Sequence, residues 1–147
     1  GKGPWFTFAN THLEAFDDRT QVPSIRAKQA GEFAKAMAGA KGALIAVGDF
    51  NSDSPGLVPG DEQAFEVLRG AGFRDIGTTT PLSCCIATSD DLRTGGDISE
   101  FDHRVDQIFT TTPKRVERVG TWVTGREQTF GFWHSDHAGV VGRYRLR

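Results

Sequence analysis

The stretch Ala43–Asn51 (ALIAVGDFN) decides the fold of this chain. It opens with a short continuous apolar run, Ala43–Val47, which is typical of a strand buried on both faces of a sheet. Asp49 and Asn51 follow this run directly, and side chains two residues apart on an extended segment point to the same side. The pattern predicts either a polar site at the end of a buried strand or a turn. Spacing alone favours the turn, because Asp and Asn often occupy turns.

The segments around this strand predict an α/β fold. Trp5–Leu13 alternates large apolar side chains with small or polar ones, as a strand does. Ser24 can cap a helix over about Ile25–Ala38, and a second helix is expected over about 61–70. The expected architecture is one mixed or mostly antiparallel sheet with helices on one face. Further strands are predicted at Phe73–Ile76, Arg104–Thr110, Val116–Thr124 and Ala138–Arg145, and a long polar loop at about Gly77–Glu100.

The composition is that of a single globular domain. The chain has 147 residues, a net charge of −2 and 37% hydrophobic residues, which suits one core and excludes wholesale disorder. No apolar run reaches the roughly 18 residues that cross a bilayer. The near-neutral charge argues against a dedicated basic nucleic-acid-binding module. Cys84 and Cys85 are adjacent, so they predict neither a disulfide framework nor a zinc site, and their role stays open.

Polar side chains interrupt the predicted strands at three more places. Asn10 and His12 lie two residues apart on the first strand, and Asp136 precedes His137 just before the last strand. Asp106 lies inside an apolar strand, where a carboxylate is costly unless it is paired, and His137 is its natural partner. Each feature alone has an ordinary explanation as a satisfied histidine or a polar turn. Four such features in one small domain, all of residue types that bind phosphate, favour a common site.

Four motifs, taken in chain order, carry a family resemblance. They are N-T-H-L at 10–13, G-D-F-N at 48–51, R-V-D-Q-I-F at 104–109 and S-D-H at 135–137. Together they resemble the endonuclease/exonuclease/phosphatase superfamily, the deoxyribonuclease-I-like group of metal-dependent phosphoesterases. The resemblance spans about Phe6–Tyr144. It implies hydrolysis of a phosphodiester or a phosphomonoester by an activated water.

The resemblance also implies a role for each motif residue. Asp49 would orient or deprotonate the attacking water, and Asn51 would hold a phosphate oxygen. His137 would hydrogen-bond the scissile phosphate, with Asp106 as its carboxylate partner. A divalent cation and hydrogen-bond donors on the phosphate oxygens would offset the charge that builds up during hydrolysis. The remaining implied residues are two substrate contacts, Asn10 and His12, and one metal ligand, Asp136, which would share Mg²⁺ (or Mn²⁺ or Ca²⁺) with Asp49.

The extent of the match departs from the family pattern. Family domains are two similar α/β layers packed face to face in a four-layer α/β/β/α sandwich, and residues 1–147 match only the C-terminal half. The N-terminal half, which normally supplies an Asn and a metal-binding Glu, has no counterpart in this sequence. We therefore expect one apolar sheet face to be covered by the missing half or by a second copy of the chain. We also expect little or no activity from these residues alone.

A second hypothesis is a non-catalytic binding or assembly module that keeps the fold and part of the site. The substrate stays undecided among a nucleic acid, a nucleotide, and a phospholipid or inositol phosphate. The segments Ser83–Cys85, Asp91–Leu92 and Phe101–Arg104 show a softer match to a less characterised bacterial branch that is often exported. That match would fit a secreted protein whose leader has been removed, and the compartment stays open. His103 and His134 have weaker cases as site residues, because a loop position explains each.

Overall fold

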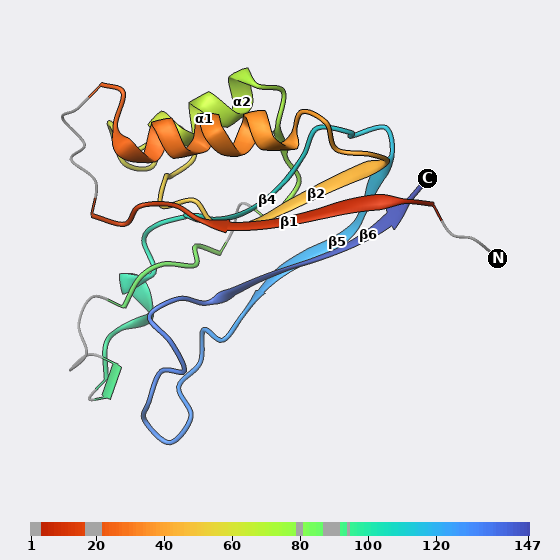
Figure 1. Ribbon diagram of the computed structural model, residues 1–147. Coiled ribbons are helices and arrows are strands. Elements are labelled where there is room, and N and C mark those ends of the chain that lie inside the picture. Colours follow the sequence, from red (N-terminus) through yellow and green to blue (C-terminus); the bar gives the residue numbers. More distant parts are fainter. Residues whose placement is uncertain (1–3, 17–21, 79–80, 87–91, 94) are drawn as a thin grey trace.

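Two helices lie on one face of a mixed β-sheet in the computed structural model (Figure 1), which describes residues 4–16, 22–78, 81–86, 92–93 and 95–147. The α/β class predicted from the sequence is confirmed. Within the described residues, no helix combines the length and the apolar character needed to cross a bilayer.

The main sheet has four strands in the order β1–β2–β4–β3. β1 (Phe6–His12) runs parallel to β2 (Ala43–Asp49), because α1 returns the chain to the same end of the sheet between them. β2 runs antiparallel to β4 (Asp106–Thr110), and the two-residue β3 (Arg74–Asp75) pairs with the far end of β4. The sheet is therefore mixed, and β2 is flanked by strands on both sides.

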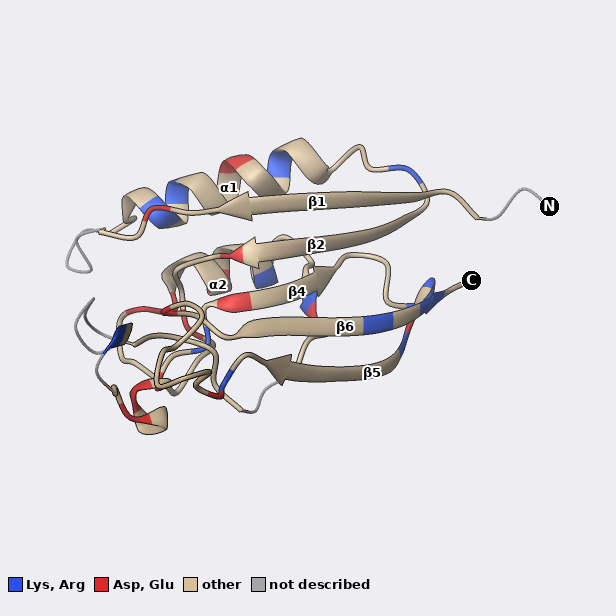
Figure 2. Ribbon diagram, turned by 90° about the horizontal axis from the view of Figure 1, so that it is seen from below, with Lys and Arg blue, Asp and Glu red and all other residues tan. Residues whose placement is uncertain are grey.

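The last two strands form a sheet of their own. β5 (Val116–Thr124) and β6 (Gly139–Leu146) pair with each other in antiparallel fashion, so the prediction of one sheet is wrong in this detail. β6 lies beside β4 (Figure 2). The two strands do not pair, and the segment that follows β3 is hydrogen-bonded to both of them. The Ile76 N–H donates to the Ile108 carbonyl (2.8 Å), and the Tyr144 hydroxyl donates to the Ile76 carbonyl (2.8 Å).

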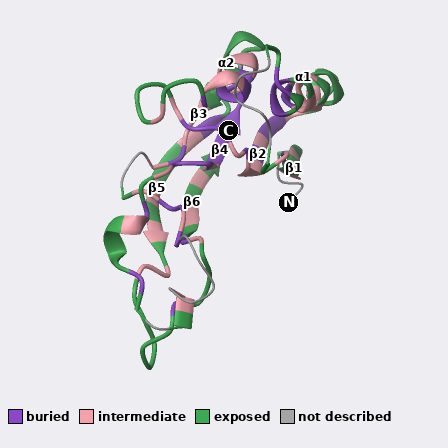
Figure 3. Ribbon diagram, turned by 90° about the vertical axis from the view of Figure 1, so that its left-hand side faces the viewer, coloured by how far each residue is buried: buried purple, intermediate pink, exposed green. Residues whose placement is uncertain are grey.

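The helices cover one face of the main sheet. α1 (Ile25–Met37) begins after Ser24, whose hydroxyl accepts the Ala27 N–H (3.1 Å), as predicted for a cap. α2 (Gln63–Gly70) lies beside it and buries its apolar side on the same sheet. Figure 3 shows that the buried residues concentrate between these helices and the sheet. The core there includes Ala30, Leu44, Phe50, Leu68 and Phe109, and the Phe50 and Phe109 rings meet edge to face at 5.0 Å.

The opposite face of the main sheet carries no helix (Figure 2). Side chains alternate along β1, and those on this face are exposed: Phe6 is 51% exposed and Phe8 60%. On β2 the residues Leu44 and Ala46 are fully buried, whereas Ile45 and Val47 on the bare face are only half-buried. The expectation that β2 is buried on both faces therefore holds for one face only.

Within its described residues, the polar segment predicted as a loop, Gly77–Glu100, forms no strand. It carries the short 3₁₀ helix η1 (Ile98–Glu100), and its residues 79–80, 87–91 and 94 lie outside the described part of the chain. The backbone of Cys84 forms isolated bridges with His103 on one side and His137 on the other. A small second core packs beside this segment and consists of Ile86, Phe101, Trp133 and Ala138.

Candidate active site

Three strand ends meet at one edge of the main sheet. In the register of the strands, His12 at the end of β1 pairs with Asp49 at the end of β2, and Asp49 pairs with Asp106 at the start of β4. His137 enters from the segment just before β6. Four polar residues that are widely separated in sequence therefore lie together.

The G-D-F-N segment follows a backbone course that these residue types permit. Gly48 has a φ of +149°, and a Cβ atom there would collide with the carbonyl of Thr11 on β1. Asn51 has a φ of 46°, in the left-handed region that Asn tolerates better than most residues. Its side-chain Nδ2 donates to the Leu13 carbonyl (2.9 Å). One of the two side-chain N–H groups of Asn51, which was predicted to hold a phosphate oxygen, is therefore already bonded to the residue that follows β1.

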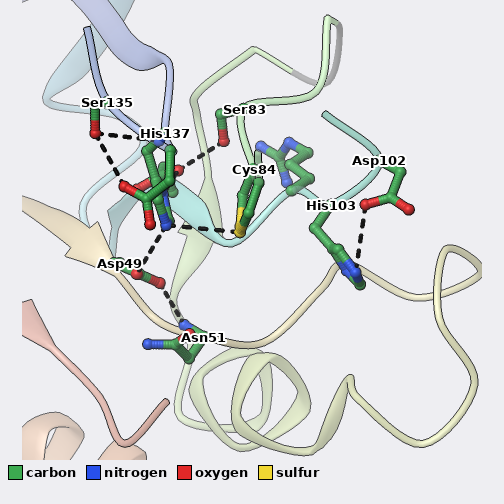
Figure 4. Close-up of a disulfide and its surroundings, with 12 residues drawn as sticks. Asp49, Asn51, Ser83, Cys84, Asp102, His103, Ser135 and His137 are labelled. Atoms are coloured by element: carbon green, nitrogen blue, oxygen red, sulfur yellow. Dashed lines mark hydrogen bonds and ion pairs between the residues drawn. A yellow bond between two sulfur atoms is a disulfide. The ribbon is translucent and has the colours of Figure 1, made fainter. Parts of the chain in front are cut away.

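The central contact of the site joins His137 to Asp106 (Figure 4). The imidazole Nδ1 lies 2.8 Å from Oδ2 of Asp106, and the Ser83 hydroxyl donates to the same oxygen (2.7 Å). This hydrogen bond, which His137 donates to Asp106, is the main cause that raises the pKa of His137 above its ordinary value, against the opposing effect of burial. Because a carboxylate only accepts hydrogen bonds, Nδ1 carries a proton, and Nε2 is the atom that faces the pocket.

Asp49 lies opposite this imidazole. Its Oδ2 is 3.8 Å from Nε2 of His137 and 3.4 Å from Nε2 of His12, while its Oδ1 accepts the Asn51 N–H (2.8 Å). Burial raises the pKa of the Asp49 carboxyl, and the charge of Asp106 adds to this effect, whereas the Asn51 N–H and the two imidazoles oppose it. The carboxylate is therefore a stronger base than an exposed Asp.

A pocket of about 410 Å³ opens at these strand ends. Asn10, Asp49, Asp106 and His137 line it, so four of the residues predicted for the site share one cavity. His12 is not among the residues that line this pocket. Its side chain contacts Asp49 and is 68% exposed.

The oxygen and nitrogen atoms at this edge could hold a metal ion. Ligand atoms of Asp49, Asp106 and His137 lie within 4.8 Å of one another. Within the described residues, Asp136 joins no such group: it is exposed, and its Oδ1 accepts the Ser135 hydroxyl (3.1 Å). Asp49 is thus the predicted metal ligand that the geometry places in the cluster.

Sequence reasoning missed the residues that brace this edge. Asp53 is fully buried, and its two carboxylate oxygens accept the Arg104 N–H (2.6 Å) and face Nδ1 of His103 (2.6 Å). The pair ties the G-D-F-N loop to the segment that leads into β4. The position of Asp53, two residues after Asn51, repeats the spacing within the motif and was the signal available. His103, explained by loop position in the sequence, is the partner of this buried carboxylate.

The two cysteines also lie at the site. The structure joins Cys84 and Cys85 in a disulfide, which the sequence argument against a bridge did not expect. The sulfur of Cys85 is 3.7 Å from Nε2 of His137 (Figure 4). Cys84 is buried and Cys85 is half-buried.

Comparison with known proteins gives matches among solved structures. No family model and no curated protein matches the sequence. An AP endonuclease from Archaeoglobus fulgidus aligns with a TM-score of 0.66 and 15% identity, over 96% of this chain and 62% of its own. A mannosyl-6-phosphatase from Bacteroides thetaiotaomicron aligns with a TM-score of 0.57 and 18% identity, over 96% and 51%. An endonuclease/exonuclease/phosphatase family protein from the same organism aligns with a TM-score of 0.59 and 19% identity, over 93% and 48%.

These neighbours, a nuclease and a phosphatase among them, share a phosphoesterase fold. This chain aligns along nearly all of its length but spans only about half to three fifths of theirs. At such identities the likeness is one of fold, and for the fold the resemblance inferred from the motifs is confirmed. The chain therefore has the fold of the endonuclease/exonuclease/phosphatase proteins, over about half of their length.

Proposed function

We propose that this chain is the C-terminal, catalytic half of a divalent-metal-dependent phosphoesterase domain. The observation that carries the proposal is the Asp106–His137 pair, which aims an imidazole into a pocket opposite the carboxylate of Asp49. Imidazole and carboxylate groups facing each other across a cavity are suited to proton transfer and to binding an anionic ester.

The proposed division of roles follows from the contacts. His137, whose pKa is raised chiefly by its hydrogen bond to Asp106, donates from Nε2 in its protonated form to a phosphate oxygen and stabilises the charge that develops there. Asp49, whose pKa is raised by burial, accepts a proton from the water that attacks phosphorus. The bond from phosphorus to the ester oxygen breaks as the new one forms. The leaving oxygen takes a proton from solvent and departs as the alcohol, while Asp49 returns the proton it accepted to solvent. Asn10 and His12 contact the substrate from β1, and Asn51 keeps one N–H for it.

The same residues fit a hard divalent cation such as Mg²⁺, Mn²⁺ or Ca²⁺. The charges of Asp49 and Asp106 repel each other, and carboxylate oxygens are the ligands that these ions prefer. Asp49 would hold the ion, whereas Asp136, the other ligand predicted from the sequence, is exposed and lies outside this cluster. When bound, the ion would neutralise part of the charge on the phosphate.

We further propose that the bare face of the main sheet packs against a second α/β layer. Phe6 and Phe8 are exposed there, and β2 is only half-buried on the same side. The structural neighbours, about twice as long as the region they share with this chain, have room for such a layer. A second copy of the chain is the other candidate for this position.

Hydrolysis of bis(p-nitrophenyl) phosphate tests the proposal. We expect slow turnover with Mg²⁺ or Mn²⁺ that EDTA abolishes, and a loss of about 100-fold or more in Asp49→Ala and His137→Ala. His134→Ala is the matched control, because this imidazole is exposed and bonds only Thr129 (2.8 Å) among the described residues. Turnover that survives both site substitutions would refute the assignment of the residues.

A second measurement decides the matter if turnover is too slow to detect. Mn²⁺ broadens the NMR signals of nearby imidazoles, so we expect loss of the His12 and His137 signals in the wild-type chain and their retention in Asp49→Ala. Signals that stay sharp in the wild-type chain, with no turnover, would overturn the proposal and favour the non-catalytic module.

A further inference from the structure

The disulfide faces the imidazole of the site. The two sulfur atoms and a ring nitrogen of His137 all lie within 4.8 Å of one another, and the Cys85 sulfur is 3.7 Å from Nε2. In Figure 4 a dashed line joins the His137 ring to a sulfur of the disulfide. The phosphoesterase roles above use neither sulfur.

We propose that, once the disulfide is reduced, Cys84, Cys85 and His137 form a binding site for a thiophilic divalent cation of the Zn²⁺ class. This site differs from the one proposed at Asp49, because it takes sulfur and nitrogen ligands where that one takes oxygen. Its existence does not depend on phosphoesterase activity.

The spacing between the Cys85 sulfur and the imidazole nitrogen of His137 suits two ligands of one ion. Zinc lies about 2.3 Å from a thiolate and about 2.0–2.1 Å from an imidazole nitrogen, so two such ligands on one tetrahedral ion are roughly 3.6 Å apart. The observed distance from the Cys85 sulfur to Nε2 is 3.7 Å. Three protein ligands and a water would complete the usual four-coordinate arrangement.

The imidazole is already oriented as a metal ligand. Its Nδ1 is bonded to Asp106, which is held in turn by the Ser83 hydroxyl. Histidines that bind zinc commonly make this kind of contact with a carboxylate, which fixes the ring and leaves Nε2 for the metal.

Backbone hydrogen bonds hold the cysteines in place from both sides. The His103 N–H donates to the Cys84 carbonyl (2.7 Å), and the Ala138 N–H donates to the Ser83 carbonyl (2.7 Å). The Ile86 N–H donates to the Asp136 carbonyl (2.9 Å). These bonds do not involve the sulfurs, so the segment keeps its position beside His137 when the disulfide opens.

The chemistry needs a reductant, and a dithiol is the natural class. The dithiol gives two electrons and two protons to the Cys84–Cys85 bond, becomes a cyclic disulfide itself, and leaves two thiols. The cation then displaces the thiol protons and binds the thiolates. Cys85, the more exposed of the pair, is the sulfur that the dithiol can reach.

Titration with Co²⁺ tests this proposal. Cobalt bound by thiolates gives a sulfur-to-metal charge-transfer band, which a purely oxygen-ligated ion lacks. We expect the band to saturate at one equivalent in protein reduced with dithiothreitol and desalted under argon, and Zn²⁺ to remove it. Oxidised protein should show no band. A band of equal strength in both states, or none in either, would overturn the proposal.

Variants identify the ligands. Cys85→Ser should weaken the band to that of a single thiolate, and Cys84→Ser with Cys85→Ser should abolish it. His137→Ala should weaken Co²⁺ binding by at least about tenfold, while His134→Ala binds like the wild type. Because Cys85→Ser could disturb folding, alkylation of the reduced wild-type protein with iodoacetamide gives a second test and should also abolish the band. Binding that persists after alkylation would refute sulfur ligation. Since no hydrolysis is measured, this result leaves the phosphoesterase proposal untouched.

Discussion

Two carboxylate–imidazole pairs flank the segment that carries the cysteines. Asp106–His137 lines the pocket, and Asp53–His103 lies on the other side of Cys84, which bridges to both histidines. The first pair is half-exposed to a cavity and suited to chemistry. The second holds a carboxylate that is fully buried, so it serves the folded structure.

The titration of His137 should depend on Asp106. The hydrogen bond that His137 donates to Asp106 raises the pKa of His137, so Asp106→Asn should lower that pKa in an NMR titration of the imidazole. Because the folded-state pKa is raised, the protonated pair stabilises the fold fully below about pH 6.5, and that stability is lost as the pH rises through the folded-state pKa. Urea unfolding of Asp106→Asn should lack this part of the pH dependence. An unchanged His137 titration would contradict the prediction.

Loss of the His103 side chain should destabilise the protein. His103→Ala leaves one oxygen of the buried Asp53 carboxylate without its partner at 2.6 Å, and we expect the free energy of unfolding to fall by about 2–3 kcal/mol. The exposed His134→Ala should change it by less than about 0.5 kcal/mol. Urea unfolding of both variants is the measurement, and equal stabilities would contradict the assignment.

The first pair could be predicted from the sequence and the second could not. Asp106 lies in an apolar strand, so its carboxylate required a partner, and the motif order pointed to His137. Asp53 follows a turn-forming motif and His103 lies outside any strand, so each had a sufficient local explanation. Only the folded backbone shows that they meet. The disulfide was missed for a similar reason, because the sequence argument considered its strain and not the backbone hydrogen bonds that hold this segment on both sides.

Among the elements, β6 is hydrogen-bonded through one of its side chains to the segment that follows β3. Tyr144, the single tyrosine of the chain, donates its hydroxyl to the Ile76 carbonyl. Tyr144→Phe removes this bond, and we expect the free energy of unfolding to fall by about 1 kcal/mol in urea or thermal unfolding. A stability equal to that of the wild type would show that the bond does not hold β6.

The same tyrosine gives a pH signal for the docking of β6. Burial is the main cause that raises the pKa of Tyr144 to about 12, and Asp75 adds to it. The neutral phenol therefore stabilises the fold fully below about pH 10, and this stability is lost as the pH rises through 12. The phenolate absorbance of the native protein should follow a midpoint near 12, and the urea-unfolded chain one near 10. A native midpoint near 10 would mean that Tyr144 is not docked.

The elements themselves were largely predictable, and their grouping was not. Periodicity and the Ser24 cap located α1 and β1, and the apolar run located β2, each to within a few residues. Whether β4 and β6 pair depends on which segment occupies the free edge of β4. Ile76 takes that position, and no local pattern in the sequence records it.

At the scale of the whole molecule, the bare sheet face should govern association. Phe6 and Phe8 are exposed on it, and apolar patches of this kind favour contacts with other surfaces. We expect light scattering to show concentration-dependent association of the chain, and the Phe6→Ser, Phe8→Ser double variant to reduce it. Phe130→Ser is the control, because Phe130 is 95% exposed but lies in the loop between β5 and β6. A well-behaved monomer at all concentrations would count against a covered face.

The way the site is assembled also affects when it can exist. His12, Asp49, Asp106 and His137 come from four separate segments, and β1 meets β2 only after α1 has been spanned. Contacts of such long sequence separation form late, because the intervening chain must first be closed into a loop. Since synthesis proceeds from the N-terminus, a growing chain lacks the complete set of these four side chains until His137 has been added. The order of synthesis therefore lets β1, β2 and their helices pack before His137 has been added to the chain.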